Sequence, residues 1–547
     1  MAQSKPEGRR LAVNAAIVMG ATLLSRITGF FREMLIPAKF GVGIVSDVYD
    51  VAFKFPDLMF SLLIGGAISA ALVPVLSGSV SRGEEDEGWQ AISRFINLTM
   101  ALTLVVCLFG IIFSEQLVVV FAQGWDPSVP EDMLKIVMAA RLMRVLFPSV
   151  AFLMLAGFAN SVLYSYQRFS SAAFGPVLYN ILCIASIALL SGGGPDEYYH
   201  VDRVVYGVML SSFTYFIFQT LWAYKNIKGN YKLCFGFRHR GFQRLFRIAL
   251  PSLVSSSVIQ VNTMVSTSFS SRFEAGSIIA MRMADRTWQM PYGIIAQSMG
   301  IALLPDLSGK HANGDFKGYK AALTSGLRYV LLLAIPIAAA CVTLNNLIMR
   351  TLFFNSNRMT EADIVLTSSI LACYSSALIT QSVNTILTRA FYAINETKTP
   401  MFVGISIIGL NIMLSVAFYN FTNVGVRGMA FSYAISSLVN VIVTLCLLNR
   451  KLPGLNALGG LGRFFVKTFG AALGMAALIL LLGRAIPSGF VTGPFSMALK
   501  IRQFMLLGVN AAAGALTYFG LLIVFRLPEA SAAIDKVKSV IKRIIKR

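Results

Sequence analysis

The chain has 547 residues, of which 56% are hydrophobic and 13% charged, and its mean hydropathy is +0.69. This composition excludes an ordinary soluble enzyme and predicts a polytopic α-helical membrane protein. The net charge of +22 does not indicate nucleic-acid binding, because the basic residues lie in alternate short loops. That distribution is typical of the cytoplasmic loops of membrane proteins.

The apolar residues gather in fourteen segments that are long enough to span a bilayer. These segments cover residues 11–38, 46–78, 91–121, 136–165, 172–191, 203–224, 244–271, 276–308, 320–346, 363–394, 400–420, 425–449, 463–485 and 500–526. Several exceed the roughly 20 residues that a spanning helix needs, so these helices must tilt, bend or extend beyond the bilayer.

The charges between the segments predict their orientation. Residues 225–247 carry seven basic side chains and no acidic one, and the tail after Pro528 carries six basic side chains. The loops on the opposite side, 122–135 and 192–202, contain acidic residues. We therefore expect both termini in the cytoplasm. The tail 527–547 is expected to form a basic amphipathic helix that lies on anionic lipid.

Two pairs of similar motifs predict an internal repeat. ALVPVLSG at 71–78 matches ALLPDLSG at 302–309, and LYSYQ at 163–167 matches FYAIN at 391–395. Each copy spans six segments, so the copies are parallel in topology, and transporters of this kind bind substrate between their halves. The expected organisation is an N-lobe at 1–224, a basic linker at 225–247, a C-lobe at 248–449, two added helices at 450–526 and the basic tail.

Arg26 and Arg32 lie inside the first apolar segment. A charge at the centre of the bilayer costs at least ~2.5–3.5 kcal/mol unless it faces protein or water. At 100° per residue, Gly29 lies midway on the shorter arc between the two arginines, so a crevice over Gly29 would expose both guanidinium groups. We interpret the pair as an anion site in a membrane cavity; interhelical contacts or snorkelling to an interface are the structural alternative.

Segment 244–271 has too many polar side chains for a helix that faces lipid. Twelve of its residues carry hydroxyl or amide groups, among them Ser256, Gln260, Asn262 and Thr263. Helix packing through small residues explains about half of them. We expect the remainder to line a water-filled cavity.

Segment 276–308 adds Arg282, Asp285 and Arg286 on one helix face. In this interpretation Asp285 neutralises one of the two arginines, and the other stays available to bind a ligand. Together with Arg26 and Arg32, Arg286 suits a ligand with two or more negative charges, because guanidinium groups bind phosphate oxygens bidentately.

Asp47 and Lys54 nearly share a face of the second segment, with Asp50 between them, and are candidates for a gate or a counter-ion set. Arg141, Arg144 and Arg389 also lie within apolar segments, and their depth favours structural snorkelling.

No catalytic machinery is expected. The six cysteines are scattered without C-x-x-C spacing, the three histidines fall in loops, and no nucleotide-binding motif occurs. The sequence thus predicts a transporter without a cofactor and gives no metal site. Coupling to a monovalent cation gradient or to the membrane potential is a hypothesis without an assigned ion site.

Several motifs resemble the MurJ (MviN) family of lipid II flippases, in the multidrug/oligosaccharidyl-lipid/polysaccharide (MOP) exporter superfamily. They are S-R-x-x-G-F-x-R at 25–32, F-G at 40–41 with Asp47 and VAFK-x-P at 51–56, ADR at 284–286 with LLP-x-LS at 303–308, and FY at 391–392 with TKTP at 397–400. The resemblance covers essentially the whole chain.

The resemblance implies a function and a site. It implies an all-α protein in the bacterial cytoplasmic membrane that moves lipid II for peptidoglycan and cell-wall biogenesis, by alternating access of a V-shaped cavity. Arg26, Arg32 and Arg286 match cavity arginines of the family, and Asp47 matches an acid. Segments 463–485 and 500–526 are expected to hold the undecaprenyl chain in a groove.

The chain departs from the family pattern at four places. Phe60-Ser61 stands where many relatives have two arginines, and Ile64–Ala67 replaces Ala-Glu-Gly-Ala. Glu33 replaces an aspartate after Arg32, and Gln289 replaces an acid. Arg282 is a candidate to compensate for the missing cation.

Two other functions stay open. One is export of another polyprenyl-diphosphate glycan. The second is a non-transporting scaffold that recruits cell-wall synthesis proteins through the basic tail.

Overall fold

The computed structural model describes residues 4–62, 69–192, 197–236, 239–353, 358–452, 461–485, 492–493 and 496–527. Within these ranges the chain is helical and has no strands. Among the helices of these described ranges, ten are long and apolar enough to cross a membrane: α4, α6, α7, α8, α12 and α14 to α18. The predicted fold class, an all-α multi-pass membrane protein, is therefore confirmed, while the count of fourteen spans stays a prediction.

The structure divides into two compact units, Met1–Ile279 and Ala280–Arg547. The helices of the first are α1 (Ser4–Phe40), α2 (Ile44–Phe60), α3 (Ser69–Arg82), α4 (Glu85–Ile112), α5 (Ser114–Phe121), α6 (Pro130–Ser165), α7 (Phe169–Leu190), α8 (Glu197–Ile227) and α9 (Arg240–Ser270). Helix α9 packs on α3, α4 and α5. The division thus falls after α9, whereas the sequence analysis placed the start of the C-lobe at residue 248.

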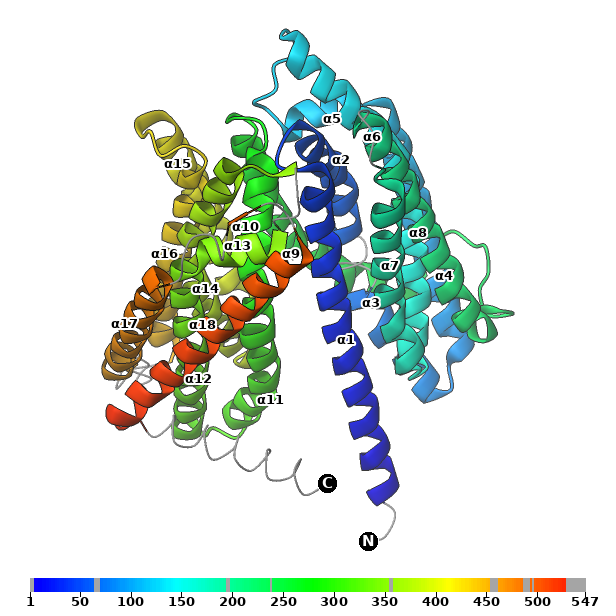
Figure 1. The fold of residues 1–547 in the computed structure, drawn as a ribbon. Coiled ribbons are helices and arrows are strands. Elements are labelled where there is room, and N and C mark those ends of the chain that lie inside the picture. Colours follow the sequence, from blue (N-terminus) through cyan, green and yellow to red (C-terminus); the bar gives the residue numbers. More distant parts are fainter. Residues whose placement is uncertain are drawn as a thin grey trace. The chain divides into compact units, whose positions relative to one another are not determined.

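The long helix α6 forms the centre of the first unit. It packs against α8, α2 and α4, and most of its apolar stretch is buried (Figure 1). Leu146 and Phe147 of α6 are fully buried in the core cluster that joins it to α2. Helix α1 lies along α7. Arg26 and Arg32 of α1 therefore lie beside a helix from later in the chain.

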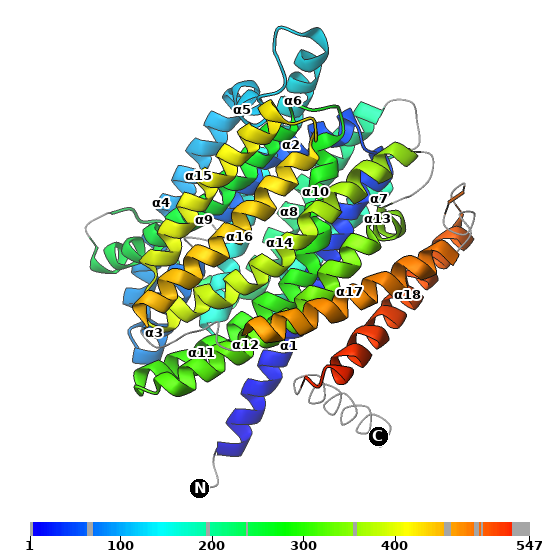
Figure 2. The same ribbon diagram turned by 90° about the vertical axis from the view of Figure 1, so that its left-hand side faces the viewer.

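The second unit comprises α10 (Ser277–Tyr292), whose first turn lies in the first unit, and the helices that follow it. These are η2 (Gly293–Gln297), α11 (Ser298–Ala312), α12 (Phe316–Thr343), α13 (Asn345–Phe353), α14 (Glu361–Ala393), α15 (Lys398–Phe421), α16 (Arg427–Lys451), α17 (Leu461–Ala485) and α18 (Met497–Val524). Helix α14 packs against α16, α12 and α11, and α17 and α18 form a hairpin beside α12 (Figure 2).

Several predicted segments consist of more than one helix. Segment 276–308 contains α10, the π-helix η2 and α11, and the π-helix starts two residues after Pro291. Proline lacks the amide hydrogen that an α-helix needs, which favours such a local change of pitch. Segment 46–78 contains α2 and α3; residues 63–68, which include Ile64–Ala67, lie outside the described residues, as does the tail from residue 528.

Candidate functional site

The face of α1 over Gly29 is covered by α7. A Cβ atom at Gly29 would lie 3.4 Å from Nδ2 of Asn180, and that amide donates to the carbonyl of Ser25 at 3.1 Å. The expected crevice over Gly29 is therefore filled by a side chain. Arg26 is exposed, and within the described part of the chain it has no hydrogen-bond or ion-pair partner.

Arg32 differs from Arg26 because it is already paired. Its Nη2 atom lies 2.7 Å from Oε1 of Glu33, and its guanidinium lies 5.7 Å from the ring centre of Tyr179 on α7. The side chain keeps 29% of its surface exposed. Arg32 is thus paired with Glu33 while part of its side chain remains exposed.

Arg286 on α10 is exposed, and among the described residues it has no hydrogen-bond or ion-pair partner. The neighbouring carboxylate of Asp285 accepts hydrogen bonds from Nε1 of Trp288 at 3.1 Å and from Nε2 of Gln289 at 2.6 Å. Arg282 is half-buried. Asp285 is therefore engaged by neutral donors one turn along its own helix, and Arg286 keeps its donors available.

Three aromatic residues that sequence reasoning missed, Trp288, Tyr374 and Tyr433, support this turn of α10. Trp288 is 2% exposed, and its ring centre lies 6.2 Å from that of Tyr374 on α14 and 6.0 Å from that of Tyr433 on α16. Packing on two neighbouring helices fixes the indole, so its N–H stays directed at Asp285. The i, i+3 spacing from Asp285 to Trp288 was the available signal.

The polar helix α9 uses part of its hydroxyl groups on itself. The hydroxyl of Thr267 donates to the carbonyl of Thr263 at 3.0 Å, and that of Ser270 donates to Ser266 at 2.7 Å. Such bonds satisfy a hydroxyl inside an apolar environment. Gln260 and Asn262 are half-buried and Thr263 is exposed, while the side chain of Ser256 lies outside the described residues.

Asp47 and Lys54, which the sequence analysis grouped as a gate or counter-ion set, contact different groups. Nζ of Lys54 lies 2.7 Å from Oδ2 of Asp50 one turn earlier. Asp47 is 4% exposed and accepts the backbone N–H groups of Gly276 at 2.7 Å and Ile279 at 2.8 Å. It thereby satisfies free N–H groups at the start of α10, where a negative charge is favoured.

A second contact lies beside Asp47, at the end of the unit opposite the N-terminus. The N–H of Gly124 donates to Oγ of Ser271 at 2.9 Å, and a Cβ atom at Gly124 would lie 2.3 Å from the carbonyl oxygen of Ser271. Only glycine permits this approach of the α5–α6 loop to the α9–α10 loop. We call the contacts of Asp47 with residues 276 and 279 and of Gly124 with Ser271 the outer latch, because the sequence analysis predicts that this end faces away from the cytoplasm.

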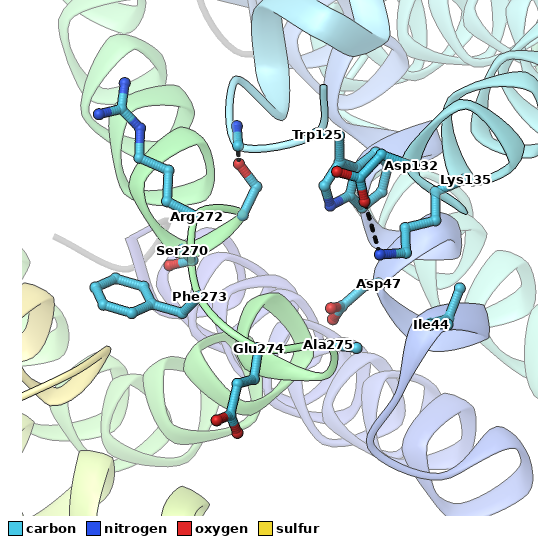
Figure 3. A pocket seen from close by; sticks show the side chains of 12 residues that line it. Ile44, Asp47, Trp125, Asp132, Lys135, Ser270, Arg272, Phe273, Glu274 and Ala275 are labelled. Carbon is cyan, nitrogen blue, oxygen red and sulfur yellow. Dashed lines mark hydrogen bonds and ion pairs between the residues drawn. The ribbon is translucent and has the colours of Figure 1, made fainter. Parts of the chain in front are cut away.

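The outer latch encloses a small polar pocket of about 120 Å³. Asp47, Lys135 and Asp132 gather at this pocket, and Glu274 also lines it (Figure 3). Nζ of Lys135 lies 2.8 Å from Oδ1 of Asp132, so this cation is neutralised within the pocket.

The family model "Lipid II flippase MurJ" matches residues 36–500 of the chain. The chain belongs to the MurJ family. Its MurJ relatives include "Lipid II flippase MurJ" from Burkholderia cenocepacia, 30% identical over 84% of this chain and 88% of the relative. "Probable lipid II flippase MurJ" from Rhizobium meliloti is 28% identical over 97% of this chain and 96% of the relative.

Solved structures show the same fold. A structure described as "Lipid II flippase MurJ, inward closed conformation" matches with a TM-score of 0.74 and 24% identity, over 93% of this chain and 99% of the other. An inward-facing multidrug resistance MATE transporter of the MOP superfamily matches with a TM-score of 0.65 and 14% identity, over 81% and 98%. The MurJ fold thus covers nearly all of the chain.

Proposed function

We propose that this protein flips lipid II, the undecaprenyl-diphosphate-linked peptidoglycan precursor, from the inner to the outer leaflet of the cytoplasmic membrane. Membership of the MurJ family and relatives named lipid II flippases over most of the chain support this function. The structural observation that carries it is the exposure of Arg26 and Arg286. Both lie in predicted membrane segments, are exposed and have no partner among the described residues.

The diphosphate is the part of the substrate that these cations bind. An unpaired guanidinium in a membrane segment is costly, and an anionic ligand removes that cost. Phosphate oxygens accept the paired N–H groups of guanidinium in a bidentate geometry. Arg26 and Arg286 bind first in this mechanism, and Arg32 joins when the diphosphate displaces Glu33. Arg282 lies on the same helix face as Arg286 and compensates for the cation that the chain lacks relative to the family pattern.

Movement across the membrane follows an alternating-access cycle. The outer latch keeps the outer end of the first unit closed while the diphosphate binds, and it opens for release. A membrane potential that is negative inside helps to expel the anion, by about 2.3 kcal/mol per charge per 100 mV. The arginine-rich site then resets with the aid of the potential or of a monovalent cation gradient.

Arginine variants test the function directly. Cells that depend on this protein are expected to stop growing when Arg26 and Arg286 are both changed to Ala, and the purified variant is expected to lose lipid II binding. Arg82→Ala is the matched control, because Arg82 is exposed and paired with Glu84. Normal growth and binding of the double variant would overturn the proposal and favour the scaffold function.

The choice of glycan is tested by competition. Purified protein is expected to bind lipid II more tightly than undecaprenyl diphosphate or a lipid-linked O-antigen. Equal affinity for all three would contradict specificity for lipid II and favour a general exporter of polyprenyl-diphosphate glycans.

A further inference from the structure

A segment without regular secondary structure follows α8 and is hydrogen-bonded to the side of α4. We call residues 231–236 the strap. Nδ2 of Asn97 donates to the carbonyls of Lys232 at 3.1 Å and Cys234 at 2.9 Å, and the N–H of Lys232 donates to Oγ of Ser93 at 3.2 Å. Asn97 and Ser93 are buried. These bonds fix the backbone of the strap along α4, where Figure 1 shows it as a green loop at the edge of the first unit.

The strap displays two large apolar side chains. Leu233 is 79% exposed and Phe235 is 62% exposed. These two residues flank Cys234, whose carbonyl accepts a hydrogen bond from Asn97 of α4. Because the backbone is bound to α4, these side chains are held away from the protein core and form an apolar ridge.

The surroundings of the ridge are aromatic and basic. Residues 221–236 contain Lys225, Lys228 and Lys232 and no acidic residue. Trp222 and Tyr224, in the last turns of α8, are each 50% exposed. Half-exposed aromatic rings, apolar side chains and lysines together are typical of a protein surface at the boundary between lipid headgroups and acyl chains.

The position of the strap along α4 agrees with that boundary. Helix α4 begins with acidic residues at 85–87, and its apolar stretch runs from Phe95 to its end at Ile112. At 1.5 Å per residue, Ser93 and Asn97 lie about 12 and 18 Å from the start of the helix. The strap is therefore attached where α4 changes from polar to apolar, which is the level of the membrane interface.

We propose that the strap is an interfacial anchor for anionic phospholipid. Leu233 and Phe235 enter the acyl-chain boundary, and Lys228 and Lys232 bind the headgroup phosphates. The lack of acidic residues in 221–236 favours an anionic lipid over a protein partner. This inference does not depend on which lipid the protein flips.

A photo-crosslinker at the ridge tests the anchor. The full chain with Leu233→p-benzoylphenylalanine is placed in vesicles of phosphatidylethanolamine with a minor share of phosphatidylglycerol, irradiated and analysed by mass spectrometry. We expect lipid adducts with phosphatidylglycerol enriched above its bulk share. The same crosslinker at Asp86, an exposed residue in the first turn of α4, is expected to give no lipid adduct.

The lysines provide the second measurement. Changing Lys228 and Lys232 to Gln is expected to return phosphatidylglycerol adducts to the bulk share, with a loss of about fivefold per lysine. Lys317→Gln, far along the chain in α12, is the matched control and is expected to leave the enrichment unchanged. Adducts to protein alone, or enrichment that survives the double change, would overturn the proposal.

Discussion

The change Asp47→Asn tests the outer latch. Asp47 accepts two backbone N–H groups at the start of α10, at 2.7 and 2.8 Å, with one carboxylate oxygen on each. Asparagine has a single acceptor oxygen and no charge, so one hydrogen bond is lost and the other is weakened. A hydrogen bond to a charged group contributes about 1.5–3 kcal/mol. The closed latch therefore loses about 3 kcal/mol, which is more than a hundredfold in its closing equilibrium.

Spin-label distances measure this equilibrium. Labels on cysteines introduced at Ser128 and Glu274 report the separation of the two loops, and both positions are exposed. Asp47→Asn is expected to shift the distance distribution towards longer separations and to slow flipping. The change Asp306→Asn removes a surface carboxylate paired with Lys310 and serves as the control. An unchanged distribution in Asp47→Asn would refute the assignment of Asp47 to the latch.

Three further predictions concern Gln289, Gly124 and Glu396. Gln289→Leu removes the hydrogen bond from Gln289 to Oδ2 of Asp285, so the carboxylate attracts the neighbouring arginine more strongly and lipid II binding is expected to fall about tenfold. The further change Asp285→Asn in the same chain is expected to restore binding. Gly124→Ala introduces a Cβ atom 2.3 Å from a backbone oxygen and is expected to open the outer latch in the spin-label experiment. Lys451 lowers the pKa of Glu396 from its ordinary value of 4.5 to about 2, so Glu396→Gln is expected to lower the melting temperature at neutral pH and to have no effect below pH 2.

The following controls and contrary outcomes apply to these predictions. For Gln289→Leu, failure of Asp285→Asn to restore binding would show that the loss is one of packing. Gly43→Ala is the control for Gly124→Ala, because a Cβ atom at Gly43 meets nothing within 4 Å. For Glu396, the depressed pKa means that its contribution is present above pH 4.5 and is lost as the pH falls through 2; an equal loss at all pH values would contradict this.

The fold class and the family could be predicted because they depend on long apolar segments and local motifs. The partners of single charges could not. Asp47 contacts a backbone segment 229 and 232 residues later, and nothing in the pattern around either end indicates that pairing. The crevice over Gly29 was inferred from helix geometry alone, and a side chain from α7 fills it. Arg32 and Arg286 were grouped as equivalent, yet one has an ion-pair partner on its own helix.

The π-helix at Gly293–Gln297 has a consequence for the direction of the charged face of α10. A π-helical turn holds about one residue more than an α-helical turn, and each residue of an α-helix turns it by 100°. Removal of one residue between 293 and 297 would restore a continuous α-helix and rotate Arg282, Asp285 and Arg286 by about that angle relative to α11. The number of residues in this short stretch, as much as their identity, therefore sets the direction in which these three side chains point.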